Sequence, residues 1–148
     1  LPEEDKEHIY ARNLEVPAGG GVGTAPAMAH AYGVFATGGR ELGLREETLR
    51  CLMAPAVPPV HGFRDECMKV EIRFSLGFMK PGPENPFGHP TSFGAPGTGG
   101  SFGFADPHAG IGYAYIPNQM GVHLQDPREG ALRTAMYRSI GEPDPYHM

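Results

Sequence analysis

The fold of this chain is decided by residues 92–107, which read SFGAPGTGGSFGFADP. Phe102 and Phe104 alternate there with small residues, and the same two-residue period returns over 111–117 after a set of turn residues. We therefore predict a strand, a glycine turn and then a hairpin that pairs 101–106 with 111–117. Because glycines on one face of these strands carry no side chain, we expect a helix or another backbone to lie close against them.

Two helices are predicted upstream of this region. The first begins at the capping residue Thr24, has Pro26 in its first turn and ends at a pair of glycines. Its inward face is predicted from apolar residues at helical spacing, which are Met28, Ala31, Tyr32 and Phe35. The second helix is predicted from Glu46 to Met53, before a run of prolines. Its inward residues are predicted to be Leu49, Leu52 and Met53. Segment 3–11 allows a further short helix.

Two more elements flank the glycine-rich stretch. Apolar and polar residues alternate strictly over 70–78, which predicts one half-buried strand over 69–80. After the hairpin, Asp126 caps a last helix that has Pro127 at its first position and Glu129 in a capping box. The inward face of this helix is predicted to be Leu132, Ala135, Met136 and Ile140. The elements together indicate an α/β (α+β) fold, an antiparallel sheet with flanking helices.

Length and charge exclude several classes of protein. A chain of 148 residues is the size of one domain. It carries 12 Lys and Arg against 17 Asp and Glu, a net charge of -5, so we expect no nucleic-acid partner. No apolar run has the length of a transmembrane helix and no signal peptide is recognised, so we expect a soluble chain without a membrane partner. The cytoplasm is compatible with this composition, which does not fix the compartment.

Neither the cysteines nor the histidines predict a metal or redox centre. Cys51 and Cys67 form no C-x-x-C pair and are expected to be reduced thiols. The 7 histidines are dispersed, and no two share the i, i+2 or i, i+4 spacing that places two imidazoles on one metal. The glycine cluster at 19–23 matches neither the dinucleotide fingerprint nor the P-loop. We therefore expect no metal and no cofactor.

One motif suggests a nucleophile and is interpreted otherwise. Residues 99–103 spell G-x-S-x-G, the nucleophile elbow of α/β-hydrolases, which needs a helix directly after the serine. The residues after Ser101 have strand periodicity, so we interpret Ser101 as the first residue of a strand. Lys80-Pro81-Gly82 resembles a K-x-G triplet, and we interpret it as a chance match. No serine has a lysine three residues later, so the chain has no S-x-x-K.

Backbone groups remain as candidates for chemistry. Around Thr98, between Gly97 and Gly99, a strand edge would carry free N–H groups and almost no side-chain bulk. Such an N–H can donate a hydrogen bond to a developing oxyanion. The alternative is that these glycines only permit tight packing, and the residues by themselves leave both interpretations open.

Three segments of the chain resemble the C-terminal end of the serine β-lactamase-like family. They are 93–107, 112–115 and 118–121, and the resemblance points to the class C β-lactamase-like esterases, relatives of penicillin-binding proteins. Upstream segments agree in the same order, at 23–25, 36–39 and 73–78, so the resemblance covers about 13–141. It implies a helical domain beside a five-stranded antiparallel sheet with flanking helices.

The resemblance also implies that part of the catalytic machinery lies outside this sequence. In that family the nucleophile is the serine of S-x-x-K, assisted by its lysine and by the tyrosine of Y-x-N, all upstream of the part matched here. Neither motif occurs in the chain. We therefore expect one partial domain over 1–148, with a helical segment over 1–68, strands and a C-terminal helix over 69–148, and an incomplete sheet. Its expected partner is the missing N-terminal portion or a second copy of the chain.

A third family motif, K-T-G or H-x-G, matches Ala95, Pro96 and Gly97. Ala95 stands where the family has a cation that helps to hold a substrate carboxylate, and its absence forfeits about 1.5–3 kcal/mol of charge-assisted hydrogen bonding. The departure implies a small neutral ester or amide in place of a penicillin-like substrate. The resemblance assigns the backbone N–H of Thr98 to the oxyanion, and places Ala95, Pro96, Gly97 and Gly99 at the substrate.

The expected function is that of the C-terminal portion of a serine hydrolase of esterase type, with the chain alone inactive. The alternative is a non-catalytic remnant that acts as a protein-association module.

Overall fold

The computed structural model describes residues 17, 19, 21–122 and 125–143. The helix allowed over 3–11 lies outside these residues. The described helices and strands are, in chain order, α2 (Ala25–Ala36), the 3-10 turn η1 (Arg40–Leu42), α3 (Glu46–Met53), β1 (Phe74–Ser75), β2 (Phe78–Met79), β3 (Phe93–Pro96), β4 (Phe102–Asp106), β5 (Ile111–Tyr115) and α4 (Pro127–Ser139).

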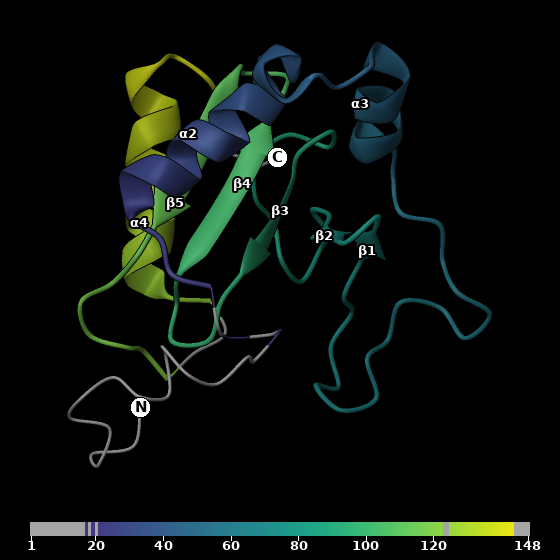
Figure 1. The fold of residues 1–148 in the computed structure, drawn as a ribbon. Helices are drawn as coiled ribbons and strands as arrows, with labels where there is room; N and C mark the ends of the chain where they lie inside the picture. The colour runs from purple at the N-terminus through teal and green to yellow at the C-terminus, as the bar shows by residue number, and fades with distance from the viewer. Residues whose placement is uncertain (1–16, 18, 20, 123–124, 144–148) are drawn as a thin grey trace.

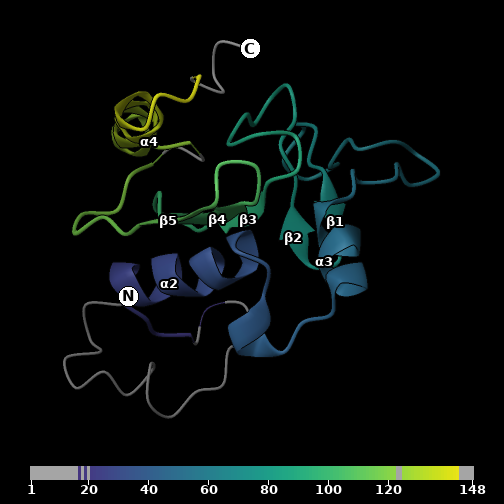
Figure 2. The same cartoon turned by 90° about the horizontal axis from the view of Figure 1, so that it is seen from above.

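The strands form one antiparallel sheet in the order β1-β2-β3-β4-β5 (Figure 1). Viewed from above, the sheet lies between α2 on one face and α4 on the other (Figure 2). This arrangement confirms the α+β fold with an antiparallel sheet and flanking helices. No helix of the described part of the chain is long and apolar enough to cross a membrane.

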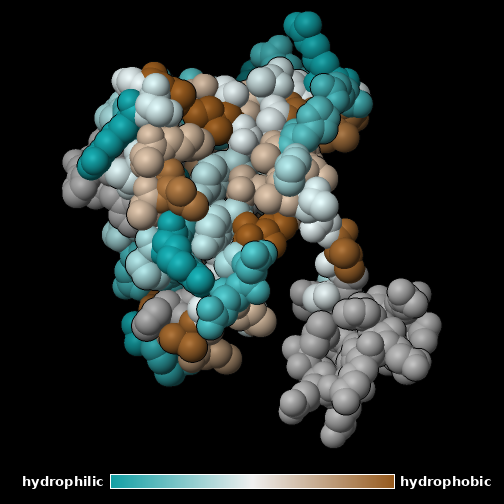
Figure 3. Space-filling model, turned by 90° about the vertical axis from the view of Figure 1, so that its left-hand side faces the viewer, coloured by the Kyte–Doolittle hydropathy of each residue, from teal (hydrophilic) through white to brown (hydrophobic). Residues whose placement is uncertain are grey.

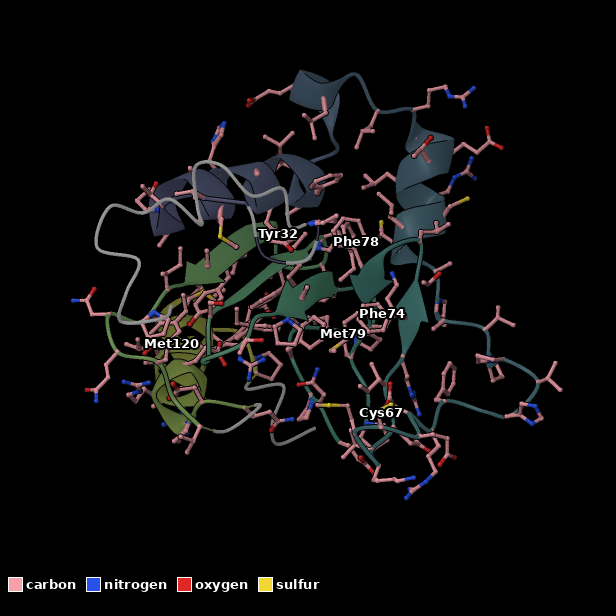
Figure 4. All side chains as sticks on the ribbon, turned by 60° about the horizontal axis from the view of Figure 1, so that its bottom comes forward. Tyr32, Cys67, Phe74, Phe78, Met79 and Met120 are labelled. Atoms are coloured by element: carbon pink, nitrogen blue, oxygen red, sulfur yellow. The ribbon has the colours of Figure 1, made fainter. Side chains whose placement is uncertain are left out.

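The alternation along β4 supplies one apolar cluster to each face of the sheet. Phe102 and Phe104 point to the α4 face, where they join Met79, Phe87 and Tyr137 in a buried cluster. Ala105 points to the α2 face, where it joins a second cluster. The members of that cluster are Ala36, Leu52, Phe93 and Ala105, with Phe78 packed against them. Phe78 lies beside Tyr32 of α2, with the two ring centroids 6.4 Å apart (Figure 4).

Helix α2 contacts the sheet through residues without bulk. A Cβ on Gly112 of β5 would lie 2.0 Å from the Gly33 nitrogen and 2.3 Å from the Ala29 oxygen. This confirms the predicted close approach of a helix to the glycine face. The predicted inward stripe was partly wrong, because Ala31 is exposed whereas Val34 and Ala36 are buried. Helix α2 is therefore turned about its axis relative to the prediction, so that its small residues face the small residues of the strands.

The ends and the faces of the first two helices are otherwise as predicted. The Thr24 hydroxyl accepts a hydrogen bond from the Ala27 N–H at 3.3 Å, which confirms the cap of α2. Helix α3 has the predicted bounds, and Leu52 is its buried residue, with Leu49 and Met53 packed against the same cluster. Cys51 and Cys67 are free, as predicted, and both are exposed.

The single strand predicted over 69–80 was wrong. The chain reverses between Ser75 and Phe78, which pair with each other, and Leu76 and Gly77 form the turn with φ of 51° and 84°. Two consecutive positive φ values characterise the tight turns that join hairpin strands. As a result, Leu76 and Phe74 are 63% and 53% exposed, although the alternation placed them on the buried face.

The inward face predicted for α4 was wrong except at Met136, which packs against the core cluster. Leu132 and Ile140 are 55% and 48% exposed and Ala135 is exposed, while Met136 is half-buried. The buried residues are Glu129, Arg133 and Tyr137. Glu129 and Arg133 are buried as a pair within the helix, with Arg133 Nε 3.2 Å from Glu129 Oε1. Their face of the helix contacts β4, where the Arg133 guanidinium lies over the Phe102 ring and the Tyr137 hydroxyl donates to Asp106. The predicted cap is confirmed, since Asp126 accepts from the Arg128 N–H.

Candidate functional site: the open edge of the β3–β4 hairpin

The edge of β3 that faces β2 is mostly unpaired. Strand β3 pairs with β4 over its whole length, from Phe93 to Pro96. Its only register with β2 joins Gly94 to Met79. Within the described ranges, no strand therefore pairs with this edge from Ala95 onward. This leaves a strip of β3 main chain beside the turn that leads to β4.

The backbone groups that point toward this edge follow from the register. The Gly97 N–H donates to the Ser101 carbonyl at 2.7 Å, so Gly97 directs its N–H toward β4. Thr98 follows in the turn, where the Gly100 N–H donates to the Gly97 carbonyl at 3.1 Å, so Thr98 is the second residue of a four-residue turn and its N–H does not take part in the pairing of β3 with β4. Pro96 has no N–H, which suits a position whose donor would face an unpaired edge.

Thr98 is exposed, and in the described part of the chain no acceptor receives its N–H. The turn that carries it is nevertheless held in place. The Gly121 N–H donates to the Gly99 carbonyl at 2.8 Å, and Met120 packs on Gly99 so closely that a Cβ there would lie 2.7 Å from Met120 Cε (Figure 4). A donor fixed in this way needs no reorganisation when it meets a developing charge.

Asp126 links the same turn to α4. A Cβ on Gly100 would lie 2.6 Å from Asp126 Oδ2, so only glycine fits at this contact. The buried Asp126 carboxylate pairs with Arg128, whose Nη2 also donates to the Gln119 carbonyl at 3.0 Å. The turn, the loop after β5 and the first residues of α4 therefore support one another.

The other candidates of the sequence analysis do not form a nucleophilic site. Ser101 is half-buried and is followed directly by β4, so the G-x-S-x-G residues lie in a strand-turn-strand and not in the strand-turn-helix of an elbow. Burial lowers the pKa of Lys80 to about 8. Its Nζ donates to the Leu52 carbonyl and lies 4.9 Å from the centroid of the Phe93 ring.

A pocket near the hairpin was not anticipated from the sequence. It holds about 340 Å³ and is lined mainly by side chains that precede β3, among them Ile72, Arg73 and Met79. Ala95, Pro96, Gly97, Thr98 and Gly99 do not line it. A narrower cavity of about 10 Å³ touches Pro96 and Ser101 and has room for little more than a water molecule.

The sequence analysis also missed a buried polar network at the other end of the hairpin. The Tyr137 hydroxyl donates to Asp106 Oδ2 at 2.5 Å, and His89 Nδ1 lies 2.8 Å from the same oxygen. Burial alone would raise the pKa of Asp106, but the hydrogen bonds from Tyr137 and His89 bring it below its usual value. Burial and the bond to Asp106 raise the pKa of Tyr137, so its hydroxyl stays protonated. The one sequence signal was the i, i+4, i+8 spacing of Glu129, Arg133 and Tyr137 on α4.

Comparison with known proteins finds that the chain is similar to part of an esterase/beta-lactamase, of a penicillin-binding protein homolog and of a carboxylesterase. No family model matches it. It is 33% identical to an esterase/beta-lactamase LipL of Mycobacterium tuberculosis over 110 residues, which are 73% of this chain and 24% of the relative. A penicillin-binding protein homolog from Caulobacter crescentus superposes with a TM-score of 0.69 and 36% identity, over 78% of this chain and 32% of that one.

A family VIII carboxylesterase superposes with a TM-score of 0.67 and 34% identity, over 78% of this chain and 31% of that one. The resemblance to β-lactamase-like serine hydrolases is thereby confirmed. The chain spans about a quarter of the curated relative and about a third of each solved structure.

Proposed function

We propose that this chain, whose relatives are esterase and β-lactamase-like serine hydrolases, supplies half of an oxyanion hole to a serine esterase. The nucleophilic serine and its lysine and tyrosine partners would come from polypeptide outside these 148 residues. The serine oxygen attacks the ester carbonyl, the alcohol leaves from the tetrahedral intermediate, and water then hydrolyses the acyl-serine. The Thr98 N–H donates to the oxygen that becomes negative in each tetrahedral intermediate.

The observation that carries the proposal is that Thr98 is exposed beside the unpaired edge of β3 and that its N–H has no acceptor among the described residues. A buried N–H without an acceptor would be a structural cost, whereas an exposed and rigidly held one is available to a ligand. The supporting contacts at Gly99 and Gly100 fix this donor without placing a side chain in front of it.

The proposed substrate is a small, neutral ester or amide. Ala95 offers no charge to a substrate carboxylate, and Pro96 offers no N–H. Gly97 and Gly99 add no side-chain bulk, so these positions form a low wall along which an acyl group could lie. A substrate carboxylate would gain nothing from this wall, which is why we favour an uncharged substrate over a penicillin-like one.

The proposed partner is the N-terminal portion of the same protein. Strand β5 pairs with β4 and is the last strand of the described sheet, so its outer edge is available for a further strand. Figure 3 shows this side of the molecule, where hydrophobic and hydrophilic residues are interspersed. The fraction of each relative that the chain spans leaves ample polypeptide to complete the sheet and to carry the nucleophile.

The proposal is tested by hydrolysis of p-nitrophenyl acetate. The 148-residue chain is compared with the longer protein that carries the upstream segment with S-x-x-K. We expect activity only in the longer protein, and its loss when that serine becomes alanine. Substantial turnover by the shorter chain would contradict the proposal, because the nucleophile would then lie within it. A Ser101→Ala variant serves as the matched control and should leave the rate of the longer protein within a few-fold.

The alternative function is protein association without catalysis. The observation that favours it is the pair of outer sheet edges at β1 and β5, because an unpaired edge readily adds a strand from another chain. It predicts a dimer or a mixed complex in sedimentation analysis. A monomer at dilution that retains protected amide hydrogens would count against association and leave the esterase proposal untouched.

A further inference from the structure

We infer that His89, His108 and Glu142 form a binding site for a zinc-like divalent transition-metal ion. The three residues come from different parts of the chain: the segment before β3, the turn between β4 and β5, and the segment after α4. One ligand atom of each lies within 4.8 Å of the others. Two imidazoles and one carboxylate are a donor set that Zn²⁺ accepts, with a fourth position for water.

The geometry of His89 is that of a metal ligand oriented by a carboxylate. Its Nδ1 lies 2.8 Å from Asp106 Oδ2, which directs the ring proton to Nδ1 and leaves the lone pair of Nε2 free. That Nε2 atom lies 3.6 Å from Glu142 Oε2, on the side away from Asp106. In many metal sites a carboxylate binds one ring nitrogen of the histidine and the metal binds the other. The carboxylate thereby fixes the tautomer and the direction of the imidazole.

Asp106 positions the second histidine as well. Its Oδ1 accepts the backbone N–H groups of His108 at 3.1 Å and of Ala109 at 3.4 Å. This holds the turn so that the His108 ring lies over the His89 ring, with centroids 4.1 Å apart. One buried carboxylate thus orients one histidine through its ring and the other through its backbone. Sequence spacing could not show this, because the fold alone brings the two histidines together.

The site is open to solvent on one side and anchored on the other. The His89 side chain is 8% exposed and that of Glu142 is 33% exposed, while His108 is exposed. An ion can therefore enter from solvent and keep a water ligand. The carboxylates of Asp106 and Glu142 supply negative charge behind and beside the ion, which favours a dication.

The location separates this site from the proposed oxyanion donor. Asp106 ends β4 and His89 precedes β3, whereas Thr98 lies in the turn at the opposite end of both strands. A bound ion would join the entry to β3, the β4–β5 turn and the segment after α4. We therefore assign it a structural role, in which it clamps the end of α4 to the sheet.

The inference is tested by titrating the tag-free, EDTA-treated chain with Zn²⁺ in a calorimeter. We expect one ion per chain and a higher midpoint of thermal unfolding in its presence. His108→Ala and Glu142→Gln should each weaken the affinity at least tenfold, since each removes one ligand at an accessible position. His61→Ala, at an exposed histidine between α3 and β1, is the matched control and should leave the affinity unchanged.

Two outcomes would overturn the inference. One is the absence of stoichiometric uptake by a chain whose circular dichroism shows it to be folded, which would reduce the cluster to an ion pair between histidine and glutamate. The other is uptake that persists in the double variant His108→Ala/Glu142→Gln, which would place the ion elsewhere. Neither result depends on esterase activity, so the proposed function stands or fails separately.

Discussion

The two ends of the β3–β4 hairpin treat their polar groups in opposite ways. At the end that contains Asp106, the carboxylate is fully buried and is bonded to Tyr137 and to two segments of backbone. At the end that contains Thr98, the residue is exposed and its N–H has no described acceptor. The first end satisfies its polar groups internally and stabilises the fold. The second holds a donor rigid and leaves it available, which is the condition for acting on a ligand.

The largest loss of stability is expected when the buried carboxylate of Asp106 is removed. Asp106→Ala would leave the Tyr137 hydroxyl and the His89 ring without their shared acceptor in a buried site. We expect the free energy of unfolding to fall by about 3 to 5 kcal/mol, the range for breaking a buried charged pair. Urea unfolding monitored by circular dichroism measures it. Equal stability of the variant and the parent would mean that the network contributes nothing to the fold.

A second prediction concerns the close contact of α2 with the strands of the hairpin region. Gly112→Val would place side-chain carbon against the backbone of Gly33 and Ala29, which has no room to yield. We expect a loss of about 3 kcal/mol or more, at the upper end of overpacking effects. Gly110→Ala is the control for a nearby glycine, because no atom lies within 4 Å of a Cβ there. Its cost, from the positive φ of 68°, should be about 1 kcal/mol.

A third prediction uses the buried lysine on the α2 face of the sheet. Burial lowers the pKa of Lys80 to about 8 from 10.5. Between these values the unfolded chain binds more protons than the folded chain, so the free energy of unfolding should rise as the pH increases from about 8 to 10.5. The full rise would be roughly 3 kcal/mol, at about 1.4 kcal/mol for each pKa unit.

The Lys80→Met variant removes this titration while keeping an unbranched apolar stem in the same place. Subtracting its urea-unfolding profile from that of the parent isolates the lysine from the tyrosines that ionise in the same range. A difference that stays flat above pH 8 would show that Lys80 has the same proton affinity in both states.

A smaller effect is expected when one donor to Asp106 is removed and the carboxylate itself is kept. Tyr137→Phe removes one of the donors to Asp106 and keeps the ring in its apolar cluster. We expect a loss of about 1.5 to 3 kcal/mol, the range for a hydrogen bond to a charged group. Leu132→Ser on the exposed face of α4 should change stability by less than about 0.5 kcal/mol. If the two variants cost the same, the assignment of the buried face of α4 is wrong.

The sequence predicted those parts of the fold in which local signals and packing agree. The cap at Thr24, the bounds of α3 and the hairpin around Phe104 follow from residues whose preferences match their final environment. The prediction over 69–80 was wrong because apolar alternation says nothing about Leu76 adopting a positive φ. The face of α4 was wrong because Glu129 and Arg133 are buried as a pair, which hydrophobicity alone does not anticipate.

The candidate site likewise has one part that was named from the sequence and one part that only the structure revealed. Thr98 and its neighbours were named from a resemblance, and the structure adds that the edge of β3 away from β4 is unpaired beside them. Their role at a substrate stays a prediction. The cluster of Asp106 with His89 and Tyr137 was not anticipated, because its members are 17 and 31 residues apart and meet only in the folded chain. Contacts of this kind depend on topology, which a single sequence does not display.

The most direct test of the central claim is the effect of removing the Thr98 N–H from the longer, active protein. Thr98→Pro deletes that donor, whereas Thr98→Ala deletes the side chain and keeps the donor. We predict that kcat for an ester falls by about 10²–10³-fold in Thr98→Pro and changes less than about threefold in Thr98→Ala, with both variants folded. Equal activity of the two variants would contradict the account, because the exposed backbone group at this end of the hairpin would then have no part in catalysis.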